Sequence, residues 1–118
     1  MTGFRPWDLV KVPFPYTDRP VRQYRPALVV AAGEIETADG LIWVLMITSA
    51  ANRRWANDVA ITNLTMAGLP VASVIRCAKI AAIEARDAER IGGLSHADQN
   101  RAVKQLAHIL VLMAGHET

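Results

Sequence analysis

The sequence predicts a mainly β domain with one C-terminal α-helix, and its closely spaced strands indicate a small barrel. Two observations lead to this fold class. Short runs rich in β-branched and aromatic residues recur over residues 7–83 and are separated by breaks that contain proline or glycine. From residue 95 onward, the apolar residues instead follow the spacing of a helical face.

The first predicted strand covers Trp7 to Val12, where apolar and polar residues roughly alternate. Pro13 and Pro15 then remove two backbone donors, so the strand is expected to stop there. The loop from Pro13 to Tyr24 contains three prolines and is long for a hairpin connection. Because long ordered loops often carry function, this loop is a candidate binding segment.

An antiparallel hairpin is expected next. Two β-rich runs, Pro26 to Ala32 and Leu41 to Thr48, flank a polar segment bounded by Gly33 and Gly40. Further along, three shorter strands are expected, the last two separated by a bend: Asp58 to Ile61, Val71 to Cys77 and Lys79 to Ile83.

The last segment is predicted to be a helix. Ser95 followed three residues later by Asp98 resembles a capping box, and Gly115 supplies the expected stop. The apolar face consists of Val103, Leu106, Ala107, Leu110, Val111 and Ala114. This face either packs on the sheet or forms part of a dimer surface, and the sequence does not distinguish the two.

Length and composition limit the class of protein. A chain of 118 residues makes one domain, residues 1–118. Hydrophobic residues make up 52% and charged residues 20%, which excludes intrinsic disorder. The longest apolar run, Leu41 to Ile47, is far shorter than the roughly 20 residues that span a membrane. Because the first thirty residues also lack the apolar segment of a secretory signal, we expect a cytoplasmic protein.

The kinds of basic side chain in the sequence weakly favour phosphate binding. Ten of the thirteen basic residues are arginine, whose planar fork matches two phosphate oxygens, although an arginine-rich genome would give the same excess. The histidines all lie at or after the helix start, and no metal-ligand spacing or glycine-rich phosphate loop occurs. We therefore expect no metal, no cofactor and no histidine base. The single cysteine, Cys77, is expected to be a buried, inert thiol.

The hairpin predicts one specific pair. If the strands pair symmetrically, with Gly33 opposite Gly40, Arg25 falls opposite Thr48. The same register pairs Ala32 with Leu41, Val30 with Trp43 and Leu28 with Leu45. Directly opposed residues share a face with Cβ atoms about 4.5 to 5.5 Å apart, so a phosphate could bridge the guanidinium and the hydroxyl. The alternative is a solvated arginine at a strand end and an ordinary strand threonine.

Five sequence blocks lie in order along almost the whole chain: WDLVKVPFPYTD at 7–18, YRPALVV at 24–30, ITS at 47–49, ASVIRCAKI at 72–80 and IGGLS at 91–95. Together they closely resemble the PemK/MazF family of toxin endoribonucleases of type II toxin–antitoxin systems. The resemblance implies an SH3-like barrel with a C-terminal helix, a homodimer and inhibition by a cognate antitoxin. It also implies cleavage of single-stranded RNA at short sequences without a metal ion.

The resemblance also implies site residues. The family's catalytic arginine and threonine match Arg25 and Thr48, the pair that the hairpin register brings together. The sequence departs from the family at Trp7, Ala72 and Ala78, where glycine, proline and aspartate are usual. These departures leave the proposed catalytic pair in place.

Further residues are expected to contact RNA. In the segment 52–55, two arginines precede a tryptophan, and stacking combined with positive charge is how proteins hold unpaired bases. An exposed loop with one hydrophobic cap explains this segment equally well. The predicted RNA-binding set is Phe14, Tyr16, Ser49, Arg53, Arg54, Trp55, Ser73 and Arg76.

The expected mechanism uses the RNA's own 2′-hydroxyl as nucleophile, which leaves a 2′,3′-cyclic phosphate and a 5′-hydroxyl. Arg25 would stabilise the charge on the phosphate, and Thr48 would hydrogen-bond a phosphate oxygen. The sequence identifies no general base.

Two alternatives stay open. A gyrase-poisoning toxin of the CcdB type would share the barrel, but such toxins use a tryptophan near the C-terminus, and here Trp7, Trp43 and Trp55 all lie upstream. A non-catalytic RNA-binding barrel is opposed only by the match at Arg25 and Thr48.

Overall fold

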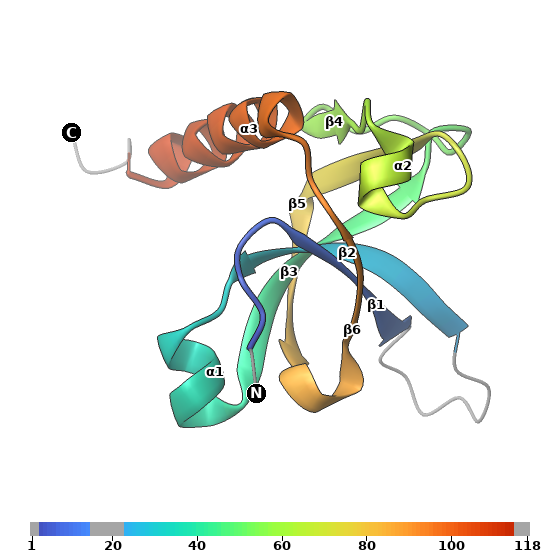
Figure 1. Ribbon diagram of the computed structural model, residues 1–118. Helices are drawn as coiled ribbons and strands as arrows, with labels where there is room; N and C mark the ends of the chain where they lie inside the picture. The colour runs from blue at the N-terminus through green and yellow to red at the C-terminus, as the bar shows by residue number, and fades with distance from the viewer. Residues whose placement is uncertain (1–2, 15–22, 115–118) are drawn as a thin grey trace.

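A six-stranded antiparallel sheet forms most of the molecule, and a long C-terminal helix packs on it (Figure 1). The computed structural model describes residues 3–14 and 23–114. Its elements are β1 (Asp8–Phe14), β2 (Gln23–Ala31), α1 (Glu34–Asp39), β3 (Leu41–Ser49), β4 (Asp58–Ala60), α2 (Leu64–Ala67), β5 (Ser73–Glu84), η1 (Ala85–Asp87), β6 (Glu89–Gly93) and α3 (His96–Ala114). Within these residues, no helix is long and apolar enough to cross a membrane.

The strands are arranged in the order β4-β5-β3-β2-β1-β6. The predicted mainly β fold with a C-terminal helix is confirmed, whereas the predicted closure into a barrel is not, because the edge strands β4 and β6 do not pair in the described sheet. The short helix α2 contacts β6 instead. At Gly68 a Cβ would lie 2.2 Å from the Ile91 carbonyl oxygen, and at Gly92 2.3 Å from that of Ala67. Only glycine allows this close approach of the two backbones.

The first strand continues past its predicted end. β1 includes Pro13 and reaches Phe14, which pairs with Gln23 of β2. The pairing of β1 with β6 ends at Lys11, so beyond that residue β1 has a free edge where a proline is tolerated. The predicted loop is therefore shorter at both ends.

The hairpin of β2 and β3 has the predicted register over part of its length. Leu28 pairs with Leu45 as expected, but Trp43 pairs with Ala31 instead of Val30 because a bulge lies between Val29 and Ala31. The polar segment is the helix α1, which does not connect the strands symmetrically. The bulge offsets this asymmetry by one residue and restores the predicted register toward the open end of the hairpin.

The two strands predicted over Val71 to Cys77 and Lys79 to Ile83 form one continuous strand, β5, and the predicted bend between them is a large bulge in that strand. Leu45 of β3 pairs with Ile80, whereas the next residue, Met46, pairs with Arg76. The register between β3 and β5 thus skips residues 77–79 of β5. Such bulges bend a strand and change the direction of its side chains.

Alternate residues of the central strands supply two apolar clusters on opposite faces of the sheet. The cluster that includes a residue of α3 contains Leu9, Leu28, Leu45, Ile47, Ile75, Leu94 and Ala102. The other contains Val10, Val12, Ala27, Val29, Ile42, Val44, Met46 and Ile83. Each fully buried side chain of this size contributes about 1.5 to 3 kcal/mol, so burial on both faces holds the strands together.

The start of α3 forms only half of the predicted capping box. The Asp98 N–H donates to Ser95 Oγ at 3.3 Å, as the pattern predicts. The Asp98 carboxylate, which is fully buried, does not return to Ser95. It accepts hydrogen bonds from the N–H and the hydroxyl of Thr62, both at 2.8 Å, and pairs with Arg101. Asp98 therefore ties the helix to the segment that follows β4.

Of the two roles left open for the predicted apolar face of α3, packing on the core is wrong for most of its described residues, and a dimer surface stays a prediction. Leu106 packs on the core as predicted, together with Ala102 and Ile109, but Val103 and Leu110 are 48% and 59% exposed. The anchoring of Asp98 sets which face of α3 turns toward the core, because residues four, eight and eleven positions later lie on the same side of the helix as Asp98. These residues are Ala102, Leu106 and Ile109. The predicted positions 111–115 have no described side chains.

Replacing Asp98 by asparagine is expected to lower the free energy of unfolding by about 1.5 to 3 kcal/mol, the contribution of hydrogen bonds to a charged group. Burial raises the pKa of Asp98, but the hydrogen bonds from Thr62, Arg101 and Ser95 outweigh it and keep that pKa below its ordinary value. Such a group stabilises the fold above the unfolded-state pKa of about 3.9, and this contribution is lost as the pH falls through the folded-state pKa.

Urea unfolding at neutral and acid pH tests this expectation. The stability gap between wild type and Asp98→Asn should be full at neutral pH and shrink in acid. Asp87→Asn, which removes an exposed carboxylate in η1, is the control and should change stability little. A gap for Asp98→Asn that is independent of pH would contradict the role assigned to its charge.

Trp7 is the one described residue other than glycine with a left-handed backbone, at φ 76°. Hydrogen bonds from its N–H to the Val29 carbonyl (2.8 Å) and from the Leu94 N–H to its own carbonyl (3.0 Å) hold it there. Trp7→Gly and Trp7→Ala both remove the indole, but only glycine relieves the strain. We expect Trp7→Gly to be the more stable by about 1 kcal/mol in chemical denaturation. Equal stability of the two variants would argue against backbone strain at this position.

Candidate active site

Arg25 and Thr48 come together at a small pocket beside the open end of the β2–β3 hairpin. The pairing of Ala27 with Met46 keeps the predicted register, so Arg25 and Thr48 lie two residues further along each strand. The pocket has a volume of about 70 Å³ and is lined by Arg25, Met46, Ile47, Thr48, Arg76 and Lys79. The arginine and the threonine that the sequence paired thus share one cavity.

Three basic side chains line this pocket, and its described lining includes no carboxylate and no histidine. Arg76 and Lys79 are three residues apart on β5, and in a regular strand they would point to opposite faces. They reach one pocket because the bulge over residues 77–79 interrupts the alternation. A cavity lined by one sign of charge attracts a ligand of the opposite sign, so the pocket suits an anion such as phosphate.

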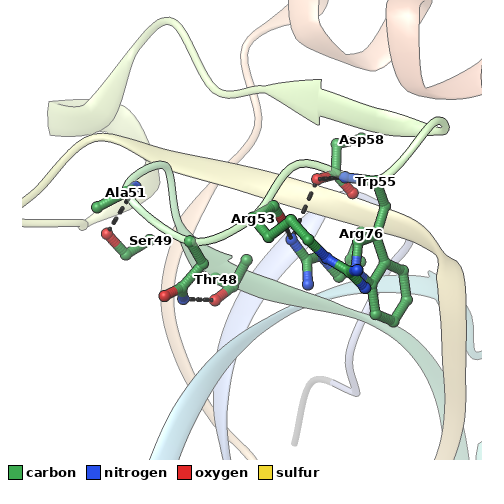
Figure 2. A network of polar contacts seen from close by, with 8 residues as sticks. Thr48, Ser49, Ala51, Arg53, Trp55, Asp58 and Arg76 are labelled. Atoms are coloured by element: carbon green, nitrogen blue, oxygen red, sulfur yellow. Dashed lines mark hydrogen bonds and ion pairs between the residues drawn. The ribbon is translucent and has the colours of Figure 1, made fainter.

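The Thr48 hydroxyl is oriented by a neighbour that sequence reasoning did not assign to the site. Asn52 Nδ2 donates a hydrogen bond to Thr48 Oγ1 at 2.6 Å, as the dashed line at Thr48 marks in Figure 2. In the same turn the Ala51 N–H donates to Ser49 Oγ at 3.2 Å. Because Thr48 Oγ1 accepts from Asn52, its own proton stays available for a phosphate oxygen.

Arg76 is held by a second group of residues, shown in Figure 2. It lies directly opposite Asp58 in the β4–β5 pairing, with Nη2 3.3 Å from Asp58 Oδ2. The same carboxylate oxygen accepts the Trp55 N–H at 2.9 Å, and Arg76 Nη2 also donates to the Arg53 carbonyl. The guanidinium carbon lies 4.2 Å from the centroid of a Trp55 ring, within the range of a cation–π contact.

A family model described as PemK-like, MazF-like toxin of type II toxin–antitoxin system matches residues 5–110. The chain belongs to this family. The fold agrees, since solved toxin structures superpose on nearly the whole chain. No sequence among the curated proteins matches it.

Three solved structures illustrate the likeness of this toxin's fold. MazF from Deinococcus radiodurans (form I) has a TM-score of 0.72 at 20% identity and covers 93% of this chain and 98% of its own. MazF-mt6 of Mycobacterium tuberculosis has a TM-score of 0.65 at 20% identity, with 88% and 94% covered. An endoribonuclease from a mycobacterial species, solved with its cognate antitoxin, has a TM-score of 0.69 at 16% identity, with 91% and 94% covered.

The other predicted RNA-binding residues differ in how exposed they are. Arg53 and Arg54 are exposed on the loop between β3 and β4, beside Trp55. Ser73 is buried, and its hydroxyl donates to the Val71 carbonyl at 2.8 Å. Ser49 pairs with Ser73 across β3 and β5 and is half-buried. Tyr16 and the side chain of Phe14 lie outside the described residues.

The predicted burial of Cys77 is confirmed. Burial, with a smaller contribution from the charge of Asp58, raises the pKa of this thiol to about 11. The thiol is therefore protonated at neutral pH and is a poor nucleophile. In the described part of the chain, no three histidine, cysteine, aspartate or glutamate side chains are grouped so that they could hold a metal ion.

A larger hollow of about 720 Å³ lies elsewhere on the toxin, beside α1 and the N-terminal segment. Its lining includes both acidic and basic side chains, and two of them, Asp8 and Arg90, already pair with each other at 3.1 Å. None of the predicted site residues lines it. The smaller pocket at Arg25 and Thr48 is therefore the candidate active site.

Sequence reasoning assigned no role at the site to three residues, Asn52, Asp58 and Lys79. Asn52 carries a weak local signal, because it follows Thr48 by four residues in a turn. Asp58 and Lys79 carry none, because their relation to the pocket depends on how β5 pairs with its neighbours.

Proposed function

We propose that this toxin is a metal-independent endoribonuclease that cleaves single-stranded RNA in the cytoplasm. The observation that carries the proposal is the pocket where Arg25 and Thr48 meet among further cations. Membership of the PemK-like, MazF-like toxin family supports it, as does the likeness of fold to a mycobacterial endoribonuclease. The loop that carries Arg53, Arg54 and Trp55 borders the site and offers positive charge and an aromatic ring to unpaired bases.

The reaction that suits these groups is an internal transfer. The 2′-oxygen of the RNA attacks the adjacent phosphorus and loses its proton, while the bond from phosphorus to the 5′-oxygen breaks and that oxygen gains a proton. The products are a 2′,3′-cyclic phosphate and a 5′-hydroxyl. Because the nucleophile belongs to the substrate, the protein has to bind, align and stabilise charge.

Arg25 and Thr48 meet these requirements in different ways. The guanidinium of Arg25 stays charged at every physiological pH and stabilises the negative charge that builds on the phosphate oxygens. The Thr48 hydroxyl, oriented by Asn52, donates to one of those oxygens and holds the phosphate in line with the attacking group. Donors placed before the reaction need no reorganisation as the charge develops, and this is the source of their effect.

We further propose that the toxin forms a homodimer and is inhibited by a cognate antitoxin. The solved relatives include MazE–MazF assemblies from Deinococcus radiodurans. Large apolar side chains are exposed on two strands and on α3, and a second copy of the chain could bury them. These are Trp43, Ile80, Val103 and Leu110.

Sedimentation or light scattering of the purified chain at micromolar concentration should give the mass of a dimer. Substitution of the exposed Leu110 by aspartate should shift the mass toward the monomer, because it places a charge among the apolar side chains that the second copy would bury. A monomer mass for the wild type would refute the dimer.

RNA cleavage should survive an excess of EDTA and should produce 5′-hydroxyl ends that a kinase labels without prior phosphatase treatment. A long RNA is incubated with the purified toxin, and the new ends are mapped. Loss of cleavage in EDTA with recovery in magnesium, or 5′-phosphate ends, would contradict the proposed reaction. Intact RNA together with damaged gyrase–DNA complexes would instead indicate a gyrase poison, and binding without cleavage a non-catalytic RNA-binding protein.

Arg25→Ala should reduce the cleavage rate by about 10² to 10³, the loss seen when one preorganised transition-state donor is removed. Arg25→Lys should recover little, because a point charge does not reproduce the planar fork. Thr48→Val keeps the branched shape and removes the hydroxyl, so its loss measures the hydrogen bond. The double variant should lose less than the product of the single losses, because the two groups act on one phosphate.

Arg86→Ala is the matched control for these variants. It removes an exposed arginine beside β5, whose partner is Glu84 at 3.3 Å, and should leave the cleavage rate unchanged. Near wild-type cleavage by a folded Arg25→Ala protein would overturn the assignment of the pair.

A further inference from the structure

One of the cations that line the pocket, Arg76, is held in a fixed position by neighbouring protein groups. Arg76 lines the pocket next to Arg25 and Thr48, yet only 12% of its side chain is exposed. Long arginine side chains at a surface usually sample many rotamers. Here the burial, the ion pair and the ring contact restrict the guanidinium to one position.

The contacts of Arg76 use one end of its guanidinium. Nη2 has two protons, and it donates to Asp58 Oδ2 and to the Arg53 carbonyl. The guanidinium also lies against Trp55. Nε is buried and has no hydrogen-bond partner among the described residues. The contacts of Nη2 therefore fix the group without satisfying all of its donors.

Asp58 is held even more tightly than its partner. Its side chain is 1% exposed, and both of its described hydrogen bonds, from Arg76 and from the Trp55 N–H, go to Oδ2. The second oxygen, Oδ1, is buried and has no hydrogen-bond partner in the described part of the chain. Asp58 also begins β4, directly after the loop that follows Thr48 and Ser49 at the end of β3. One carboxylate thus positions both a pocket cation and the far end of the loop that carries Trp55.

Stabilisation of the fold does not explain this arrangement well. A buried ion pair is weak evidence for stability, because the cost of removing two charges from water offsets most of their attraction. Two buried polar atoms without partners add to that cost. Arrangements that are unfavourable in this way are typical of functional sites.

We propose that Asp58 is a positioning residue that holds Arg76, already predicted to contact RNA, as a second phosphate-binding cation of the pocket. The inference rests on the proposed function, because RNA supplies the phosphate. Arg25 and Arg76 approach the pocket from β2 and β5, on the two sides of β3, so that together they contact the backbone of one RNA strand. Asp58 touches no substrate and acts through Arg76.

Binding of an uncleavable RNA tests the proposal separately from catalysis. The probe is a single-stranded 2′-O-methyl RNA of random sequence, and its Kd is measured over a range of salt concentrations. Arg76→Met should weaken binding about tenfold, as expected for one hydrogen-bonded charge contact. It should also reduce the slope of log Kd against log salt by about 0.7, the value for one phosphate contact with a single strand.

Asp58→Asn distinguishes positioning from a general electrostatic effect. If Asp58 only reduces the positive charge of the pocket, removing its charge strengthens binding. If it positions Arg76, Asp58→Asn weakens binding by about the same factor as Arg76→Met, and the double variant binds no more weakly than Arg76→Met alone, because the two residues act as one unit.

Two further variants keep the test interpretable. Asp58→Leu combined with Arg76→Met removes both charges, and such apolar replacements of a buried pair usually fold. It must bind like Arg76→Met, and full wild-type affinity would overturn the proposal even if the single variants did not fold. Glu84→Gln breaks an exposed arginine–carboxylate pair on the same strand and should leave both Kd and slope unchanged.

The outcomes also separate this proposal from the proposed function. A wild-type toxin that neither binds the probe nor cleaves RNA would overturn both. A wild-type toxin that cleaves RNA, with Arg76→Met and Asp58→Asn proteins that bind the probe with wild-type affinity and slope, would overturn only the role of this pair.

Discussion

The antiparallel pairing of β3 with β2 on one side and β5 on the other decides where each side chain of the candidate site lies. Thr48 meets Arg25 across the first pair of strands, and Met46 meets Arg76 across the second. A shift of one residue in either pairing would turn these side chains to the opposite face. Both faces of these strands are buried, so such a shift would disrupt the packing of two apolar clusters at once. The core and the site therefore depend on one register.

Two buried carboxylates show how the same group serves the fold in one place and the candidate site in another. Asp98 accepts hydrogen bonds at both oxygens and fixes the rotation of α3. The described hydrogen bonds of Asp58 all go to one oxygen, and its partner Arg76 keeps a buried donor without a described acceptor. Fully satisfied buried groups rigidify a fold, whereas unsatisfied ones mark positions where a ligand or a solvent molecule completes the network. This contrast between Asp98 and Asp58 supports the proposed role of Asp58.

The placement of Arg25 near Thr48 could be predicted because the hairpin is local in sequence, but the agreement depends partly on two deviations that cancel. The connection through α1 is one residue off symmetry, and the bulge between Val29 and Ala31 compensates for it before the chain reaches Arg25. The face of α3 could not be predicted in the same way. Both Val103 and Ala102 fit an apolar stripe, and only the anchor of Asp98 against Thr62 selects the one that turns inward.

The sequence by itself determined most of the strands, the start of the terminal helix, the buried thiol and the family, because each depends on local periodicity, on capping residues or on motifs read in order. The strand β6 was not predicted, and β5 was predicted as two strands. Tertiary structure alone decided that the sheet stays open, that Ser73 is buried, and that Arg76 and Lys79 reach one pocket with Arg25. These features depend on how far β5 bulges against β3 and on which residues of β4 oppose it. Pairing between strands distant in sequence is set by packing of the whole core, which no local pattern encodes.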